Sequence, residues 1–180
     1  MVDLSLYNNK WYHPGAGIIK RILWYYTNEI FFVSGLFPVN GLKILLLRLF
    51  GAKIGIGVVI KPHVNIKYPW HLTIGNHTWI GENVWIDCLT HVHIHDHVCI
   101  SQGALILTGN HDYSKSSFDL IIKPIQIHSG AWIGSRAVVC PGVSVGHHAV
   151  LTVGSVASKD LQPCYIYKGN PAISVKYRPL

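Results

Sequence analysis

An aliphatic residue returns every six positions along most of the chain, and this period limits the fold more than any other feature. A small or β-branched residue follows four positions later in most repeats, and glycine often follows directly. The aliphatic positions are Ile54, Ile60, Ile66, Ile74, Ile80, Ile86, Ile94, Ile100, Ile106, Ile127, Ile133, Val139, Val145 and Leu151. A period of six residues fits neither an α-helix nor a strand in which buried and exposed residues alternate. We therefore predict an all-β chain folded as a triangular parallel β-helix of about five coils.

The period slips at three places that fall on the same corner. The repeats advance by eight residues after Ile66 and after Ile86, and by 21 after Ile106. His71, His91 and His111 each lie five residues beyond these positions, so we expect them to form a column along that corner. A loop at 112–126 should leave from the top of the column. Because a regular array needs no such interruption, we look for function at Gly109–Tyr113.

The segments outside the repeats suggest ends rather than separate domains. We divide the chain into an arm and capping helices (1–53), the β-helix (54–160) and a C-terminal tail over the coil (161–180). Apolar residues at helical spacing predict helices near 17–37 and 38–50. They are expected to cap the coil, and the alternative is a peripheral membrane contact through 17–50. Charged residues interrupt every long apolar run there, so no spanning helix is predicted.

The composition of the chain favours some classes of binding partner over others. Only 13% of residues are charged while 49% are hydrophobic, so part of the surface should be buried against other copies or a membrane. The net charge of +7 is dispersed, which disfavours nucleic acid. Four cysteines without paired spacing and no secretory signal indicate reduced thiols in a cytoplasmic protein, at the inner face of the membrane if the helices touch it.

Several stretches together resemble one known family. They are Leu47–Gly55, Tyr68–Trp70, Trp79–Glu82, Ile100–Ala104, Gly109–Tyr113, Pro141–Val143, Ser158–Asp160 and Gly169–Ala172. On these residues the chain resembles the hexapeptide-repeat acyltransferases, and within them the colanic acid biosynthesis acetyltransferases, relatives of the galactoside, maltose and nodulation-factor acetyltransferases. The resemblance implies the left-handed form of the β-helix, homotrimers with sites between subunits, acetyl-CoA as donor, and no metal.

The resemblance also implies roles for particular residues. His111 would be the general base that takes a proton from a saccharide hydroxyl, and imidazole suits this role near neutral pH. The acceptor, a saccharide or lipid-linked saccharide, would contact Trp85, Asp87, Cys88, Asn110 and Tyr113. Acetyl-CoA would contact Trp132, Gly154, Ser155, Ser158, Lys159, Lys176 and Arg178. Exopolysaccharide or O-antigen biosynthesis is the expected context.

Three alternatives remain open at this stage. An amine acceptor, as in amino-sugar N-acetyltransferases, would use the same base. Twelve histidines raise the zinc site of the γ-class carbonic anhydrases, which needs two histidines five apart on one subunit. Within the run His91, His93, His95 and His97 the spacing is two, which argues against that site. A β-helix used only for assembly is the third alternative.

Overall fold

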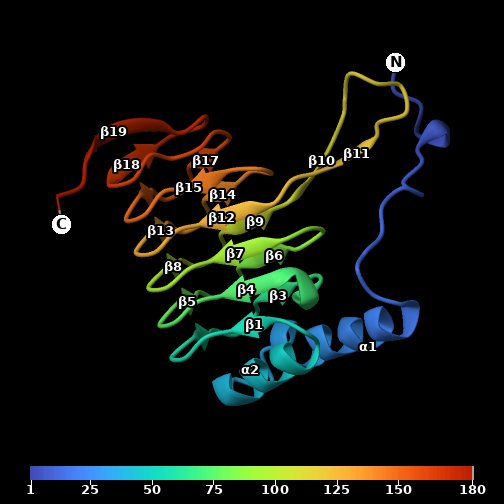
Figure 1. Cartoon of the computed structure of the whole chain (residues 1–180), viewed down its shortest axis with the longest axis horizontal. Helices are drawn as coiled ribbons and strands as arrows, with labels where there is room; N and C mark the ends of the chain where they lie inside the picture. The colour runs from blue at the N-terminus through green and yellow to red at the C-terminus, as the bar shows by residue number, and fades with distance from the viewer. Residues whose placement is uncertain (180) are drawn as a thin grey trace.

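The computed structural model describes residues 1–179, most of which form a left-handed parallel β-helix with a triangular cross-section. Figure 1 shows the stacked coils from the side. Three columns of short parallel strands make three flat faces. The first face contains β1 (Lys53–Ile54), β4 (Leu72–Ile74), β7 (Val92–Ile94), β12 (Ile125–Ile127) and β15 (Ser144–Val145). The second contains β2 (Val59–Ile60), β5 (Trp79–Ile80), β8 (Cys99–Ile100), β13 (Trp132–Ile133), β16 (Val150–Leu151) and β18 (Tyr165–Lys168). The third contains β3 (Asn65–Ile66), β6 (Trp85–Asp87), β9 (Leu105–Leu107), β14 (Val138–Val139) and β17 (Val156–Ala157).

The aliphatic residues of the six-residue period fill the interior. On the third face Ile66, Ile86, Ile106 and Val139 lie in register and are fully buried. Equivalent columns line the other two faces, so the predicted fold is confirmed. Ile54 is only partly buried, because it lies in the first coil, at the end of the β-helix that the N-terminal helices cover.

Glycine follows an interior residue where two successive coils approach closely. At Gly81 a Cβ atom would lie 2.8 Å from the backbone nitrogen of Gln102 and 2.9 Å from the carbonyl oxygen of Ile100. Those atoms belong to the next coil and cannot move independently of it. The position therefore requires a residue without a side chain.

The N-terminal helices cap the first coil. They are α1 (Ile18–Asn28), a π-helical turn at Glu29–Val33, and α2 (Asn40–Leu49), and shorter 3-10 turns lie at Leu4–Leu6 and Pro69–His71. Trp24 Nε1 donates to the carbonyl oxygen of Ile66 (2.8 Å), and Lys43 Nζ donates to that of Lys61 (2.9 Å). These bonds satisfy backbone groups that would otherwise be exposed at the ends of the third and second faces.

All three slips in the period lie at one edge of the prism, where the third face leads into the first. We call this edge the loop edge; it comprises residues 67–71, 88–91, 108–124, 140–143 and 158–160. At the third coil the chain leaves as a hairpin of β10 (Gly109–His111) and β11 (Leu120–Ile122). The hairpin projects beside the N-terminal arm (Figure 1). The stem thus begins before the predicted loop at 112–126, and Ile125 and Gln126 already belong to β12.

The coil continues beyond residue 160, the predicted end of the repeats. Leu161 bridges to Val145 on the first face, and Ile166 of β18 lies beside Val150 on the second. Only then does the chain reverse, as β19 (Ile173–Tyr177) pairs antiparallel with β18. The tail therefore completes part of a sixth coil before it turns back.

Candidate active site

His111 lies on the stem of the hairpin, opposite Leu120, and is partly buried. The chain leaves the loop edge at Gly109, where a Cβ atom would lie 2.5 Å from Leu89 Cδ1. Glycine therefore allows β10 to cross directly over the preceding coil. The backbone bonds between β10 and β11 then hold His111 outside the prism, beside the coils rather than on them.

Phe118, on the same hairpin, fixes the orientation of the imidazole. Its ring stacks on that of His111, with centroids 4.4 Å apart and planes inclined by 4°. His111 Nδ1 donates to the carbonyl oxygen of Phe118 at 2.9 Å. Because a carbonyl oxygen only accepts, Nδ1 carries the proton of the neutral ring, and Nε2 keeps its lone pair. This arrangement leaves Nε2 able to accept a proton from a bound nucleophile.

A cavity of about 480 Å³ opens beside His111, and much of its wall comes from the N-terminal arm. The arm is anchored at three points. The backbone N–H of Asp3 donates to the carbonyl oxygen of Ser116 at the hairpin tip (2.8 Å). Tyr12 Oη donates to that of Leu89 (2.9 Å), and Trp70 Nε1 donates to that of Pro14 (2.7 Å). The cavity is lined by Tyr7, Asn9, Tyr12, Pro14, Arg21, Lys67, Tyr68, Leu89, His111 and Leu120.

Sequence reasoning did not assign the arm to the site. Residues 1–14 have no periodicity, and their contacts join positions far apart in the chain, such as Tyr12 with Leu89. The only signal was their content of tyrosine, tryptophan and asparagine, side chains that often line polar binding sites.

Two cationic side chains, Arg21 and Lys67, also line this cavity. Lys67 Nζ lies 3.4 Å from Asp87 Oδ1, close enough for an ion pair. The pair is not aligned as a hydrogen bond, so the buried Oδ1 has no hydrogen-bond donor among residues 1–179. Burial, followed by the nearby Tyr68 and Asp87, raises the pKa of Tyr12 well above its usual range. Tyr12 therefore remains a neutral hydrogen-bonding group in this cavity.

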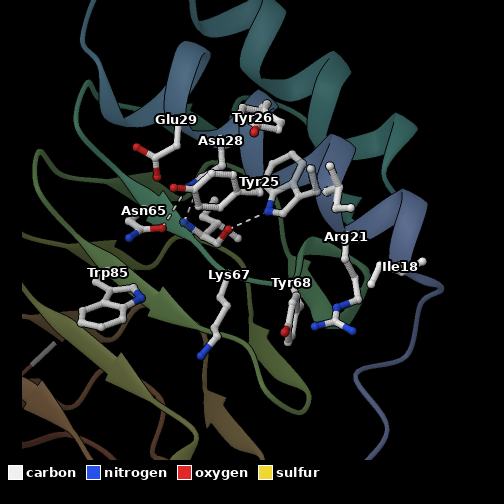
Figure 2. A pocket seen from close by; sticks show the side chains of 13 residues that line it. Ile18, Arg21, Tyr25, Tyr26, Asn28, Glu29, Asn65, Lys67, Tyr68 and Trp85 are labelled. Atoms are coloured by element: carbon white, nitrogen blue, oxygen red, sulfur yellow. Dashed lines mark hydrogen bonds between the residues drawn. The ribbon is translucent and has the colours of Figure 1, made fainter.

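A second cavity, of about 540 Å³, adjoins the first and extends along α1 (Figure 2). Both cavities are lined by Arg21, Lys67 and Tyr68, which form their common boundary. Beyond that boundary the second cavity is mainly apolar, with Trp85 from β6 on one side and Ile18 and Ile22 of α1 on the other.

The five residues predicted to bind the acceptor do not all lie at the cavities. Trp85 lines the second cavity, and Asp87 pairs with Lys67 at the boundary. The side chain of Cys88 is fully buried in the coil and lines neither cavity, and burial together with Asp87 raises the pKa of its thiol. Asn110 accepts from the backbone N–H of His111 and so shapes the hairpin. Tyr113 is 83% exposed near the hairpin tip and does not line the cavity.

The residues predicted to bind acetyl-CoA are not gathered at one site within a single chain. Ser158 and Lys159 lie on the loop edge, two coils beyond the hairpin, whereas Gly154 lies at the edge between the second and third faces. Arg178 Nη1 donates to the carbonyl oxygens of Gly130 (3.4 Å) and His148 (3.1 Å), at the remaining edge. Trp132 is half exposed on the second face, and Lys176 is exposed on β19.

The hydroxyl of Ser155, another residue predicted to contact acetyl-CoA, makes its hydrogen bonds within the coil. The residue is 1% exposed, and its hydroxyl bonds to that of Thr152 and accepts from the backbone N–H of Gly169, both at 3.0 Å. These bonds hold the last turn of the coil together, so the hydroxyl of Ser155 has a structural role.

The predicted histidine column exists only in part. The rings of His71 and His91 stack edge to face, 5.1 Å apart, and burial, followed by the nearby His91, lowers the pKa of His71. His111 does not continue the column. Ile125 lies beside Val92 in register, so Pro124 takes the place above His91, because the hairpin removes His111 from the edge.

Within residues 1–179, no group of three or more His, Cys, Asp or Glu side chains is arranged to hold a metal ion. No helix in this part of the chain combines the length and apolarity needed to cross a membrane.

Several known proteins are similar to this chain in sequence or in structure. No family model matches the chain. WcaF of Escherichia coli strain K12, which carries the provisional name colanic acid biosynthesis acetyltransferase, is 36% identical over 99% of this chain and 98% of its own. Galactoside O-acetyltransferase of the same strain is 31% identical over 67% of this chain and 61% of its own. A hexapeptide-repeat acetyltransferase of Vibrio cholerae, solved with acetyl-coenzyme A, superposes with a TM-score of 0.79 at 25% identity, covering 88% of this chain and 87% of that one.

Proposed function

The chain belongs to the hexapeptide-repeat acetyltransferases, in the group that contains WcaF, and on this premise we propose that it acetylates a saccharide hydroxyl with His111 as general base. It is an acyltransferase that uses acetyl-CoA as donor. The observation that carries the proposed role is the fixed imidazole: Nδ1 is held by the Phe118 carbonyl, and the ring borders a polar cavity.

The reaction needs no covalent enzyme intermediate, because the thioester is already activated. The acceptor oxygen attacks the carbonyl carbon of the acetyl group while its proton passes to His111 Nε2. The carbon–sulfur bond then breaks, and the departing thiolate takes the proton from the imidazolium. The stacked Phe118 ring and the Nδ1 bond keep the base oriented throughout, which is the main contribution expected of this scaffold.

We further propose that the complete site forms between subunits of a homotrimer. The residues expected to contact acetyl-CoA lie on different edges of one prism, so one chain alone does not bring them together. A neighbouring prism packed against the loop edge would supply the missing side. Light scattering coupled to gel filtration should give the mass of three chains of 20.1 kDa each; a stable active monomer would contradict this arrangement.

The helical end of the molecule supports a peripheral membrane contact. Ile19 and Leu23 of α1 and Leu49 of α2 are all more than half exposed. Exposed apolar side chains near lysine and arginine are typical of helices that lie at a lipid surface. Sedimentation with anionic lipid vesicles would test this, and Leu23→Asp should reduce the bound fraction.

The proposed chemistry is tested by thiol release from acetyl-CoA with a panel of free and lipid-linked saccharides. We expect His111→Ala to reduce kcat by about a hundredfold or more, as for other general bases. His91→Ala is the matched control, because His91 does not line the cavity beside His111. We expect this variant to act at the wild-type rate. An unchanged rate in His111→Ala would reject the mechanism. Analysis of the product by mass spectrometry and base lability would distinguish an ester from an amide.

A further inference from the structure

Part of the N-terminal arm lines the cavity beside His111 but takes no part in the proton transfer. The arm residues at the cavity are Tyr7, Asn9, Tyr12 and Pro14. Tyr12 and Pro14 already anchor the arm through hydrogen bonds to the coil. Within residues 1–179, no hydrogen bond engages the side chain of Tyr7 or of Asn9. These two side chains therefore have polar groups available to a ligand.

The arm holds Tyr7 at a fixed place relative to the hairpin. It begins at the hairpin tip and runs beside the hairpin (Figure 1), and the backbone N–H of Asp3 donates to the carbonyl oxygen of Ser116 at 2.8 Å. The Asp3 carboxylate accepts from the backbone N–H of Ser5 at 3.0 Å and so caps the 3-10 turn at Leu4–Leu6. Tyr7 follows that turn directly. Its position is thus tied to the element that carries the base.

Tyr7 lies close to the base without stacking on it. The ring centroids of Tyr7 and His111 are 5.7 Å apart, and the planes are inclined by 56°, whereas the Phe118 ring is nearly parallel to the imidazole. An acceptor hydroxyl must come within about 3 Å of Nε2 to lose its proton. Because Tyr7 and His111 line the same cavity, a sugar placed in this way also lies against Tyr7.

We propose that Tyr7 is an acceptor-binding residue, through which the N-terminal arm selects the sugar. The ring of Tyr7 packs against the C–H face of the sugar. Its hydroxyl, together with the Asn9 amide, bonds to hydroxyl groups beside the one that is acetylated. An aromatic ring with a polar tip suits a sugar, which presents C–H groups on its faces and hydroxyls at its rim. The inference rests on the proposed function, because it places the acceptor beside His111.

The test is the steady-state rate of thiol release from acetyl-CoA with methyl glucoside, methyl galactoside and methyl mannoside as acceptors. The arm and the base contact one sugar ring, so a methyl glycoside carries every group that they recognise. At least one of the three should therefore be acetylated. We expect Tyr7→Phe to raise the acceptor KM about fivefold, the effect of one lost hydrogen bond. Tyr7→Ala should raise it about twentyfold or more, because the ring is lost as well.

Other readouts separate contact with the acceptor from a structural role. A contact that is equally strong in the bound state and in the transition state changes KM alone. In both Tyr7 variants kcat, its pH profile and the KM for acetyl-CoA should therefore keep their wild-type values. Asn9→Ala should also raise the acceptor KM. Leu4→Ala is the matched control, because Leu4 belongs to the same arm, is 67% exposed and does not line the cavity.

Four results would overturn the inference. A lower kcat or a shifted pH profile in Tyr7→Ala, with the acceptor KM unchanged, would show that Tyr7 acts on the base. An equal rise of the acceptor KM in Leu4→Ala would show a general disturbance of the arm. A raised KM for acetyl-CoA would assign Tyr7 to the donor. Acetylation of lipid-linked saccharides but of no methyl glycoside would place acceptor recognition outside the arm.

This inference and the proposed function fail in different measurements. A wild-type acceptor KM in Tyr7→Ala would reject the role of Tyr7 and leave transfer by His111 intact. Transfer that persists in His111→Ala would reject the proposed mechanism, whatever the acceptor KM of the Tyr7 variants. Absence of transfer to every saccharide would reject both.

Discussion

The contact between Phe118 and His111 gives the most specific test of how the base is positioned. Phe118→Ala removes the ring stacked at 4.4 Å but leaves the backbone carbonyl that accepts from Nδ1. An aromatic pair of this kind contributes about 0.5–1.5 kcal/mol beyond burial. If about 1 kcal/mol of this favours the productive ring orientation, kcat/KM should fall about fivefold.

Two further variants at this position separate stacking from backbone strain. Phe118 has a φ of +49°, a left-handed conformation that costs most residues about 1–2 kcal/mol. Phe118→Gly relieves that cost, so it should be more stable than Phe118→Ala to urea while losing the same activity. Phe118→Tyr keeps the stack and should be close to wild type.

The assay is the rate of thiol release from acetyl-CoA at saturating and at limiting acceptor, with the urea midpoint measured on each variant. Wild-type kcat/KM in Phe118→Ala, with His111→Ala inactive, would refute the claim that stacking positions the base. The claim would also be refuted if the activities of the Phe118 variants followed their urea midpoints and not the presence of an aromatic ring.

Three other perturbations test parts of the structure away from the base. Gly81→Ala places a methyl group within 3 Å of the next coil, so we expect a loss of about 1–3 kcal/mol in the free energy of unfolding, read from urea denaturation; an unchanged midpoint would contradict the close approach of the coils. Burial lowers the pKa of His71 in the folded state, so the unfolded chain takes up a proton more readily. Stability should therefore be complete above the unfolded value of about 6.5 and fall as the pH drops below it, with a smaller fall in His71→Gln. Ser155→Ala leaves the Gly169 N–H and the Thr152 hydroxyl without a partner, which should cost about 1–3 kcal/mol, whereas Ser158→Ala, at an exposed position, should change the urea midpoint little.

The sequence alone determined the coil, because a β-helix repeats one local geometry. Each coil places residues such as Ile66, Ile86 and Ile106 at the same point of the interior, so position in the period predicts burial directly. The same counting located the edge at which all the insertions leave the prism. It also drew attention to His111, which borders the polar cavity.

The six-residue period did not predict the positions of residues in the segments that interrupt it. It placed His111 above His91, but pairing between β10 and β11 moves the residue onto a hairpin and brings Pro124 to that position. The period also could not show that the side chain of Cys88 is fully buried, because a one-dimensional pattern does not show which way the chain turns within an insertion.

Only the tertiary structure decided what surrounds the base. The arm contacts the hairpin through Asp3 and Ser116, and the cavity joins Tyr12 to Leu89, across most of the length of the chain. Such contacts depend on where the capping helices direct the arm, and no local pattern of residues encodes that direction. The period thus specifies the prism, whereas packing between distant segments specifies the site.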